Sequence, residues 1–119
     1  MKRLIFIVIG LCLGMFANNA QQLEDECNAG KSAACASLGF MYGDGKKIKQ
    51  DFKKAIIFSK KACELKNAMA CYNLAMLYQN GLGTKKDLST TKEYFGKACD
   101  FGEQGGCFQY KVLYRKGIR

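Results

Sequence analysis

The sequence contains no histidine and no proline. The absence of histidine excludes a Ser-His-Asp triad and a Cys-His pair, because both need an imidazole as the base. It also excludes any metal site built on two histidines. The absence of proline leaves no residue that would break a helix from within. Enzymes that use such sites are therefore excluded. Long uninterrupted helices are compatible with the sequence.

The N-terminal residues have the pattern of a secretory signal peptide. The basic residues Lys2 and Arg3 precede an apolar run over residues 4–16, and two alanines follow this run closely. This order of basic, apolar and small residues is typical of a cleaved leader. We predict a signal peptide over residues 1–20 and a mature domain over residues 21–119, with cleavage near the boundary between them.

Two alternatives remain for the leader. The apolar run is shorter than the roughly 20 residues that span a bilayer, which argues against an uncleaved anchor. A lipoprotein would need a small residue before Cys12, and Leu11 stands there instead. We therefore expect no stable membrane insertion of the chain after the leader is removed.

Six of the seven cysteines form three pairs with one spacing. Within each pair the cysteines are eight positions apart, and successive pairs follow at an offset of 36 residues. Other positions keep this offset, among them Tyr42, Tyr78 and Tyr114. The chain therefore contains an internal repeat with a period of 36 residues. The cysteine pairs are Cys27 with Cys35, Cys63 with Cys71, and Cys99 with Cys107.

The repeat indicates how these cysteines pair. Six cysteines in an exported chain suggest disulfides, and of their fifteen connectivities only pairing within each spacing gives every unit the same structure. In one helix such Cα atoms would lie about 12 Å apart, whereas a disulfide tolerates about 7 Å, so the chain must turn between them. Zinc is the competing use, but the spacing is wider than a zinc knuckle and histidine is absent. Neither a metal nor a cofactor is expected.

Each repeat reads as a helix, a glycine-containing loop and a second helix. Apolar and small residues at Ala34, Leu38 and Tyr42 form the stripe of one helical face, and the stripe recurs one repeat later. The loops begin with glycines suited to a helix C-cap and end at Asp51 or Asp87, which are good N-caps. The second helices are then expected over residues 52–65 and 88–101.

These features predict an all-α fold: a short, right-handed solenoid of helix hairpins with about five helices. Two complete repeats are flanked by a half-helix at "LEDEC" and by a lone first helix from Gly106 onward. Each disulfide would staple one repeat to the next, and closing an eight-residue loop stabilises a fold by about 2.5 kcal/mol. Three such staples approach the whole net stability of a small domain. They would compensate for the small core of so short a solenoid.

The stretch "SLGFMYGDGKKIKQDFKKAIIFSKKAC" resembles the Sel1-like repeat, a longer relative of the tetratricopeptide repeat. The cysteine pairs are similar to those of the Helicobacter cysteine-rich protein family, and the resemblance covers residues 23–118. It implies a secreted or periplasmic solenoid with one disulfide per repeat and a protein-binding shape. It also implies penicillin binding, weak β-lactamase activity and recognition of cell-wall muropeptides. The chain departs from the family pattern at Tyr110 and Lys111, where a leucine and a small residue are usual.

One short pattern offers catalytic chemistry. The residues "STTK", Ser89 to Lys92, match the S-x-x-K motif of serine β-lactamases and penicillin-binding enzymes, in which the lysine helps to activate the serine. The companion S-D-N and K-T-G motifs are absent. Ser89 and Lys92 are the catalytic candidates, and the alternative is that Ser89 is an ordinary serine in the first turn of a helix.

A candidate ligand groove lies beside the packing stripe of each first helix. These positions lie about 80° from the stripe at 100° per residue, and they vary between repeats while the stripe does not. In helix-pair solenoids the first helices line the concave binding surface. The alternative is that these residues are exposed and have no role. They are Ser37, Phe40, Asp44, Asn73, Met76, Asn80, Gln109, Val112 and Lys116.

The net charge is +9, and loss of Lys2 and Arg3 with the leader reduces it to +7. The lysines either form an ordinary solvated surface or attract anionic envelope polymers and acidic partners. Export makes nucleic acid an unexpected partner. We predict a periplasmic or secreted binding module, expected as a monomer, for a protein, a muropeptide or a β-lactam. The alternative is a penicillin-binding protein with weak β-lactamase activity.

Overall fold

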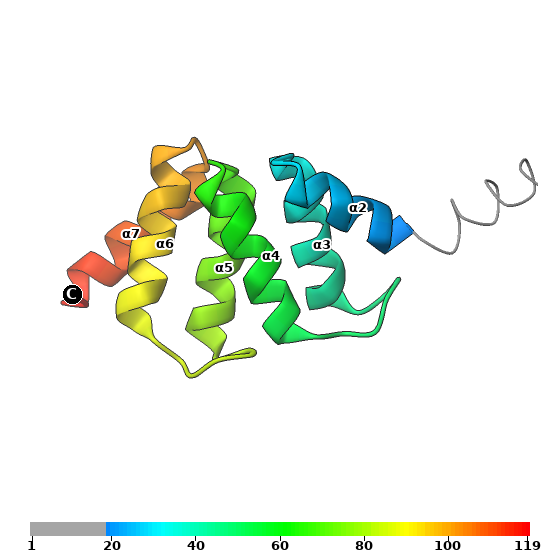
Figure 1. Ribbon diagram of the computed structural model, residues 1–119. Helices are drawn as coiled ribbons and strands as arrows, with labels where there is room; N and C mark the ends of the chain where they lie inside the picture. The colour runs from blue at the N-terminus through cyan, green and yellow to red at the C-terminus, as the bar shows by residue number, and fades with distance from the viewer. Residues whose placement is uncertain (1–18) are drawn as a thin grey trace, which may run out of the picture.

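The computed structural model describes residues 19–119, and in this part of the chain it contains helices and no strand (Figure 1). The all-α architecture predicted from the sequence is confirmed. About five helices were expected and six are present in residues 19–119, because the half-helix expected at "LEDEC" extends over 10 residues. The helices are α2 (Asn19–Asn28), α3 (Ser32–Asp44), α4 (Phe52–Glu64), α5 (Ala68–Asn80), α6 (Leu88–Asp100) and α7 (Gln104–Arg115).

The predicted signal peptide falls almost entirely outside the described residues. Of residues 1–20, only 19 and 20 belong to the part that the structure describes, and they open α2. Cleavage of the leader therefore stays a prediction. Among the helices of residues 19–119, none is both long enough and apolar enough to cross a membrane.

Local signals set the ends of the helices in the two hairpins, α3–α4 and α5–α6. The side chains of Asp51 and Asp87 accept hydrogen bonds from the backbone N–H groups three residues further on, at 3.1 and 3.0 Å. These bonds satisfy amide groups that have no partner inside the helix. Gly45 and Gly81 follow α3 and α5 with φ of 68° and 66°, in the left-handed region that favours glycine. The loops therefore begin and end where the sequence predicts.

The helices form two layers. In Figure 1, α2, α4 and α6 lie on the viewer's side, and α3, α5 and α7 lie behind them. Each helix packs against its neighbours in sequence, and α3 also contacts α5. The buried residues form three clusters that follow one another along the chain. The core is therefore a row of small clusters, as expected for a solenoid in which each repeat contacts only its neighbours.

An aromatic pair closes each hairpin. The ring of Tyr42 on α3 stacks on that of Phe58 on α4, with 5.8 Å between the ring centroids. The ring of Tyr78 on α5 stacks on that of Tyr94 on α6 at the same distance. Stacked pairs of this kind add about 0.5–1.5 kcal/mol beyond the apolar area that they bury. The 36-residue offset thus preserves a specific contact between helices.

The three disulfides join the cysteines that the repeat pairs. They link Cys27 to Cys35, Cys63 to Cys71 and Cys99 to Cys107, with Cα atoms 4.7, 4.7 and 4.5 Å apart. Each one crosses the turn between a helix of one layer and the next helix of the other layer: α2 to α3, α4 to α5, and α6 to α7. The disulfides therefore join α2 to the first hairpin, the first hairpin to the second, and the second hairpin to α7.

Candidate binding groove

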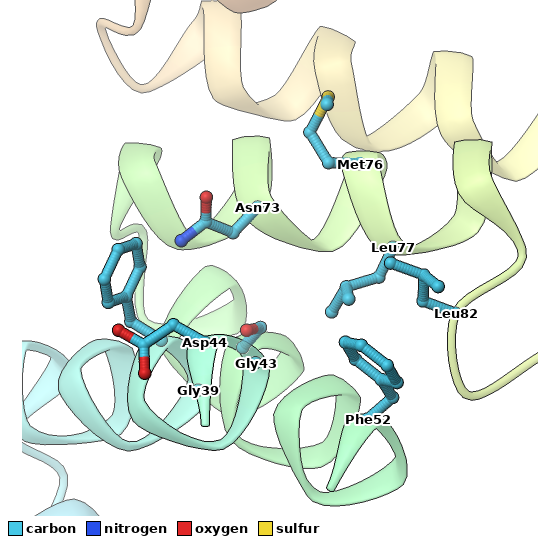
Figure 2. A pocket seen from close by; sticks show the side chains of 10 residues that line it. Gly39, Gly43, Asp44, Phe52, Asn73, Met76, Leu77 and Leu82 are labelled. Atoms are coloured by element: carbon cyan, nitrogen blue, oxygen red, sulfur yellow. The ribbon is translucent and has the colours of Figure 1, made fainter. Parts of the chain in front are cut away.

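A pocket of about 230 Å³ opens between α3, α4 and α5. Figure 2 shows the side chains of Phe52, Leu77 and Leu82 gathered at one end of it. The amide of Asn73 and the carboxylate of Asp44 lie at the other end. The pocket therefore has an apolar end and a polar end, and it is open to solvent.

Small side chains explain why the pocket exists. Gly39 on α3 faces Ser59 on α4 so closely that a Cβ atom at Gly39 would collide with the Ser59 hydroxyl oxygen. Gly43, one turn further along α3, also lines the pocket, and a Cβ atom there would have only the Ala55 Cβ atom near it, at 3.9 Å. Gly39 and Ser59 therefore allow α3 and α4 to pack closely, and at Gly43 no side chain fills the space that the pocket occupies.

The equivalent positions of the α5–α6 hairpin carry larger side chains. Ala75 and Gln79 stand where α3 has its two glycines, and Phe95 stands in place of Ser59. The ring of Phe95 is fully buried, packs with Ala75, and makes an edge-to-face contact with Tyr72 at 5.2 Å. The same backbone arrangement is therefore packed with side chains in one hairpin and hollow in the other.

The polar end of the pocket has capacity for a ligand. The side chain of Asn73 is half-buried, and its amide makes no hydrogen bond to any other residue in the range 19–119. One carboxylate oxygen of Asp44 accepts a hydrogen bond from the backbone N–H of Lys46 at 2.9 Å. The Asn73 amide can both donate and accept, so it is suited to a peptide group.

A second hollow of about 480 Å³ adjoins the pocket. It is lined by residues of α2, α3 and α5 and by Lys47 of the loop after α3, and it shares Phe40 and Asn73 with the pocket. Two large apolar side chains at this hollow are open to solvent, since Phe40 is 59% exposed and Met69 is 56% exposed. Pocket and hollow together form a groove that runs across α3 and α5. This groove is called the α3–α5 groove below.

Sequence comparison finds two copies of a known repeat in the chain. A family model described as the Sel1 repeat matches residues 32–67 and 68–102. The chain belongs to the Sel1 repeat family. The first Sel1 repeat contains α3 and α4, and the second contains α5 and α6. The pocket therefore lies where the two Sel1 repeats meet.

Three solved structures have a similar fold. The Sel1 repeat protein from Oxalobacter formigenes gives a TM-score of 0.77 at 23% identity, over 83% of this chain and 41% of that one. Cysteine rich protein B of Helicobacter pylori gives a TM-score of 0.70 at 32% identity, over 74% of this chain and 66% of that one. A protective antigen of uropathogenic Escherichia coli with an SLR fold gives a TM-score of 0.75 at 26% identity, over 83% of this chain and 21% of that one. The chain thus spans only part of each structure. A comparison with curated proteins gives no match.

The resemblance to the Helicobacter cysteine-rich proteins is confirmed by these findings. The descriptions of the matched structures name repeat proteins and an antigen, and none of them names an enzymatic activity. Penicillin binding and β-lactam hydrolysis therefore gain no support from them.

The structure brings together part of the groove expected from the sequence. Phe40, Asp44, Asn73 and Met76 line the pocket, and Ser37 lines the adjoining hollow. The remaining candidates line neither, and the groove is bordered by α2, by the first Sel1 repeat and by α5 with the loop that follows it. These remaining residues are Asn80, Gln109, Val112 and Lys116.

Sequence reasoning missed the residues that give the pocket its shape. The predicted groove residues did not include Gly39, Gly43 or Ser59, because a small residue in a helix does not indicate a cavity by itself. Phe52 and Leu82 lie at the start of α4 and in the loop after α5, outside the first helices that were considered. A comparison of side-chain volume between the repeats could have indicated the pocket, since Phe95 stands in place of Ser59 at the 36-residue offset.

The two catalytic candidates lie at the other end of the molecule. Ser89 and Lys92 line one hollow beside α6, together with Glu93 and Asp100. The Lys92 ammonium donates a hydrogen bond to the backbone oxygen of Ile118 at 2.9 Å, and it also lies over two tyrosine rings of α7. These contacts make Lys92 a link between α6 and the C-terminal segment. No hydrogen bond joins Ser89 to Lys92 in the described part of the chain.

Proposed function

We propose that the protein is an exported binding module that holds a peptide segment of a partner protein in the α3–α5 groove. Sel1 repeats typically serve as protein-interaction modules, and the chain has this fold. The observation that carries the proposal is the open apolar pocket with an unpaired amide, that of Asn73, at its edge. Such a site combines an apolar anchor position with a polar group that fixes orientation.

The size of the pocket favours a peptide. Small-molecule sites usually have volumes of about 300–1,000 Å³, so a pocket of about 230 Å³ suits one apolar side chain better than a whole sugar-peptide ligand. Beside that anchor, the Asn73 amide would donate to and accept from the peptide backbone. The exposed ring of Phe40 would cover a neighbouring residue in the adjoining hollow.

The compartment belongs to the same proposal. Three disulfides within 101 described residues (119 less the first 18) support an oxidising environment, such as the periplasm or the outside of the cell. A leader over residues 1–20 would take the chain there. N-terminal sequencing of protein recovered from the cell envelope checks this, since recovery of a chain that begins at Met1 would contradict it.

The function is tested by filling the pocket. A random peptide library is selected on residues 19–119, and the enriched peptide is titrated by calorimetry against Gly43→Leu. A Cβ atom at Gly43 would have only the Ala55 Cβ atom near it, at 3.9 Å, and Gly43 lines the pocket, so a leucine there should occupy the pocket and weaken binding at least tenfold. The matched control is Gln79→Leu, at the equivalent position of the second repeat, and it should bind as the unmodified protein does.

Two further results bear on the proposal. Asn73→Ala should weaken peptide binding about fivefold, the value of one hydrogen bond, whereas Gln109→Ala at the equivalent position of α7 should not. Selection of no peptide, combined with muropeptide binding that Gly43→Leu does not affect, would overturn the proposal.

A further inference from the structure

The positive charge of the protein is concentrated in one stretch of the first Sel1 repeat. Residues 46–66 contain eight lysines and two acidic residues, a net charge of +6 out of +9 for the whole sequence. All eight lysines are exposed. The two ion pairs of residues 19–119 join Lys31 to Glu26 and Lys97 to Glu93, so none of the eight is neutralised by an ion pair. The lysines are Lys46, Lys47, Lys49, Lys53, Lys54, Lys60, Lys61 and Lys66.

These lysines lie in the loop before α4, on the outer side of α4 and directly after it. Lys53, Ile57 and Lys60 follow one another along one face of α4 at helical spacing. This face is turned about 120° around the helix from Phe52 and Ser59, which face the pocket, taking 100° per residue. The loop 45–51 and this outer side of α4 are called the lysine face below. Its α4 part lies away from the pocket, whereas Lys47 of the loop also lines the hollow of the α3–α5 groove.

An apolar side chain sits among these cations. Ile57 is 52% exposed, although its neighbours on the same face of α4 are lysines. Two other lysines of α4 are held at the edge of the face, since Lys54 lies over the Tyr42 ring at 5.3 Å and Lys61 over the Phe58 ring at 5.9 Å. A partner at this face would therefore meet both charge and an apolar group.

The second Sel1 repeat keeps lysines at the positions of Lys49 and Lys61, as Lys85 and Lys97, but it shows that the fold does not need the lysines on the outer side of α4. At the positions of Lys53, Lys54 and Lys60 it has Ser89, Thr90 and Gly96, and at the position of Ile57 it has Glu93. The backbone of α6 nevertheless has the same length and the same type of N-cap as that of α4. The lysine face is thus a property of the first repeat and not a requirement of helix packing.

We propose that the lysine face docks the protein on an anionic lipid bilayer, with Ile57 entering the headgroup region. Basic residues near an anionic membrane surface each strengthen binding about fivefold. A bilayer surface accepts an apolar side chain together with the surrounding cations, whereas a hydrated soluble polyanion offers a place only for the charges. The pocket lies on another side of α4, so docking through the outer side of α4 would leave the pocket accessible to a peptide.

The test uses residues 19–119, which contain all six helices and the three buried clusters and lack the apolar run of the leader. Vesicles of phosphatidylcholine mixed with phosphatidylglycerol are compared with vesicles of phosphatidylcholine alone by co-sedimentation. We expect binding to the anionic vesicles only, and we expect it to weaken with added salt. Binding to both vesicle types with equal strength would overturn the proposal.

Matched variants test whether binding depends on the lysine face or only on the net charge of the protein. Lys49→Gln, Lys53→Gln and Lys60→Gln combined should weaken vesicle binding about 100-fold, by fivefold for each charge removed. The control combines Lys85→Gln, Lys86→Gln and Lys116→Gln, which remove the same charge elsewhere and should change binding by less than about fivefold. An equal loss of vesicle affinity in both triple variants would show that net charge alone attracts the protein to the vesicles, and it would overturn the proposal that the lysine face is the docking site. All six side chains are exposed, so circular dichroism should show unchanged folding in both.

The substitution Ile57→Asn distinguishes a bilayer from a soluble polyanion. Loss of the apolar group should weaken binding to anionic vesicles about tenfold and leave binding to polyglutamate unchanged. An unchanged affinity for vesicles, together with polyglutamate binding that the lysine variant abolishes, would identify a soluble acidic partner and overturn the membrane proposal.

Discussion

The first Sel1 repeat, α3 with α4, and the second, α5 with α6, have one backbone design and two different surfaces. All four helices contain 13 residues, each second helix begins at an aspartate N-cap, and each hairpin holds an aromatic pair at 5.8 Å. The first repeat nevertheless borders a pocket where it meets α5, and it carries a row of lysines. The second repeat is filled by Phe95, and its equivalent outer positions carry Ser89, Glu93 and Gly96.

This comparison distinguishes the features that maintain the backbone from those that vary at the surface and in the core. Caps, turns and disulfides act over a few residues and recur in both repeats, so they maintain the helix hairpins. Side-chain volume and surface charge vary between the repeats without disturbing those hairpins. Binding surfaces can therefore be added to one repeat while the other supplies packing and stability.

The largest effect is expected from emptying the packed repeat. Phe95→Ala should lower the free energy of unfolding by about 3–5 kcal/mol, because a fully buried ring is replaced by a cavity. Ser59→Ala, at the equivalent position of the first repeat, should change it by less than about 1 kcal/mol, since the pocket is already there. Urea denaturation followed by circular dichroism measures both. Similar losses for the two variants would mean that the repeats do not differ in packing.

A smaller effect is expected from separating the two repeats. Cys63→Ser combined with Cys71→Ser removes the disulfide between α4 and α5 and should lower the free energy of unfolding by about 2.5 kcal/mol. Hydrogen exchange should then show the two repeats opening independently. The matched control, Cys27→Ser with Cys35→Ser, should release α2 while the two repeats still open as one unit. Cooperative opening of both repeats in the first variant would contradict this account.

The smallest effect concerns the N-cap of α6. The Thr90 backbone N–H and the Thr90 hydroxyl, which donates at 2.8 Å, hold the pKa of Asp87 below its ordinary value of 3.8. A lowered pKa in the folded protein means that this contribution to stability is present above about pH 3.8 and is lost as the pH falls through the lowered value. In the first repeat Lys54 replaces Thr90 and has no hydroxyl to donate.

Removal of that hydroxyl tests the account. Thr90→Ala should raise the pKa of Asp87 toward its ordinary value, and Thr90→Ser should keep it low because the hydroxyl remains. Carboxyl chemical shifts followed by NMR across the acid range measure the change. An unaltered pKa in Thr90→Ala would assign the whole shift to the backbone N–H group.

Much of the fold could be predicted because its signals are local and repeated. The eight-residue spacing of Cys63 and Cys71 requires a turn, and the offset to the other pairs shows that the same turn recurs. Asp51 and Asp87 mark the starts of α4 and α6 in the same way, since an N-cap acts within three residues. The extent of α2 was underestimated, because it has no preceding copy in the sequence with which to compare it.

The groove could be predicted only in part. Asn73 and Phe40 were expected there because helical periodicity places them beside the packing stripe. The depth of the pocket depends on Gly39 and Ser59, which lie on different helices, and on how closely those helices approach. Such a distance follows from the packing of all side chains at the interface and is not encoded in either helix alone.

The sequence by itself determined the 36-residue repeat, the hairpins, the disulfide pairing and the concentration of lysines in residues 46–66, because each depends on residue type and spacing along the chain. Only the tertiary structure decided that a pocket opens in the first repeat and that Lys92 reaches the backbone of Ile118. These features join residues of different elements, such as Lys92 and Ile118, which are 26 positions apart. Their contact depends on how the helices stack, and periodicity does not specify how much space the stacked side chains leave between them.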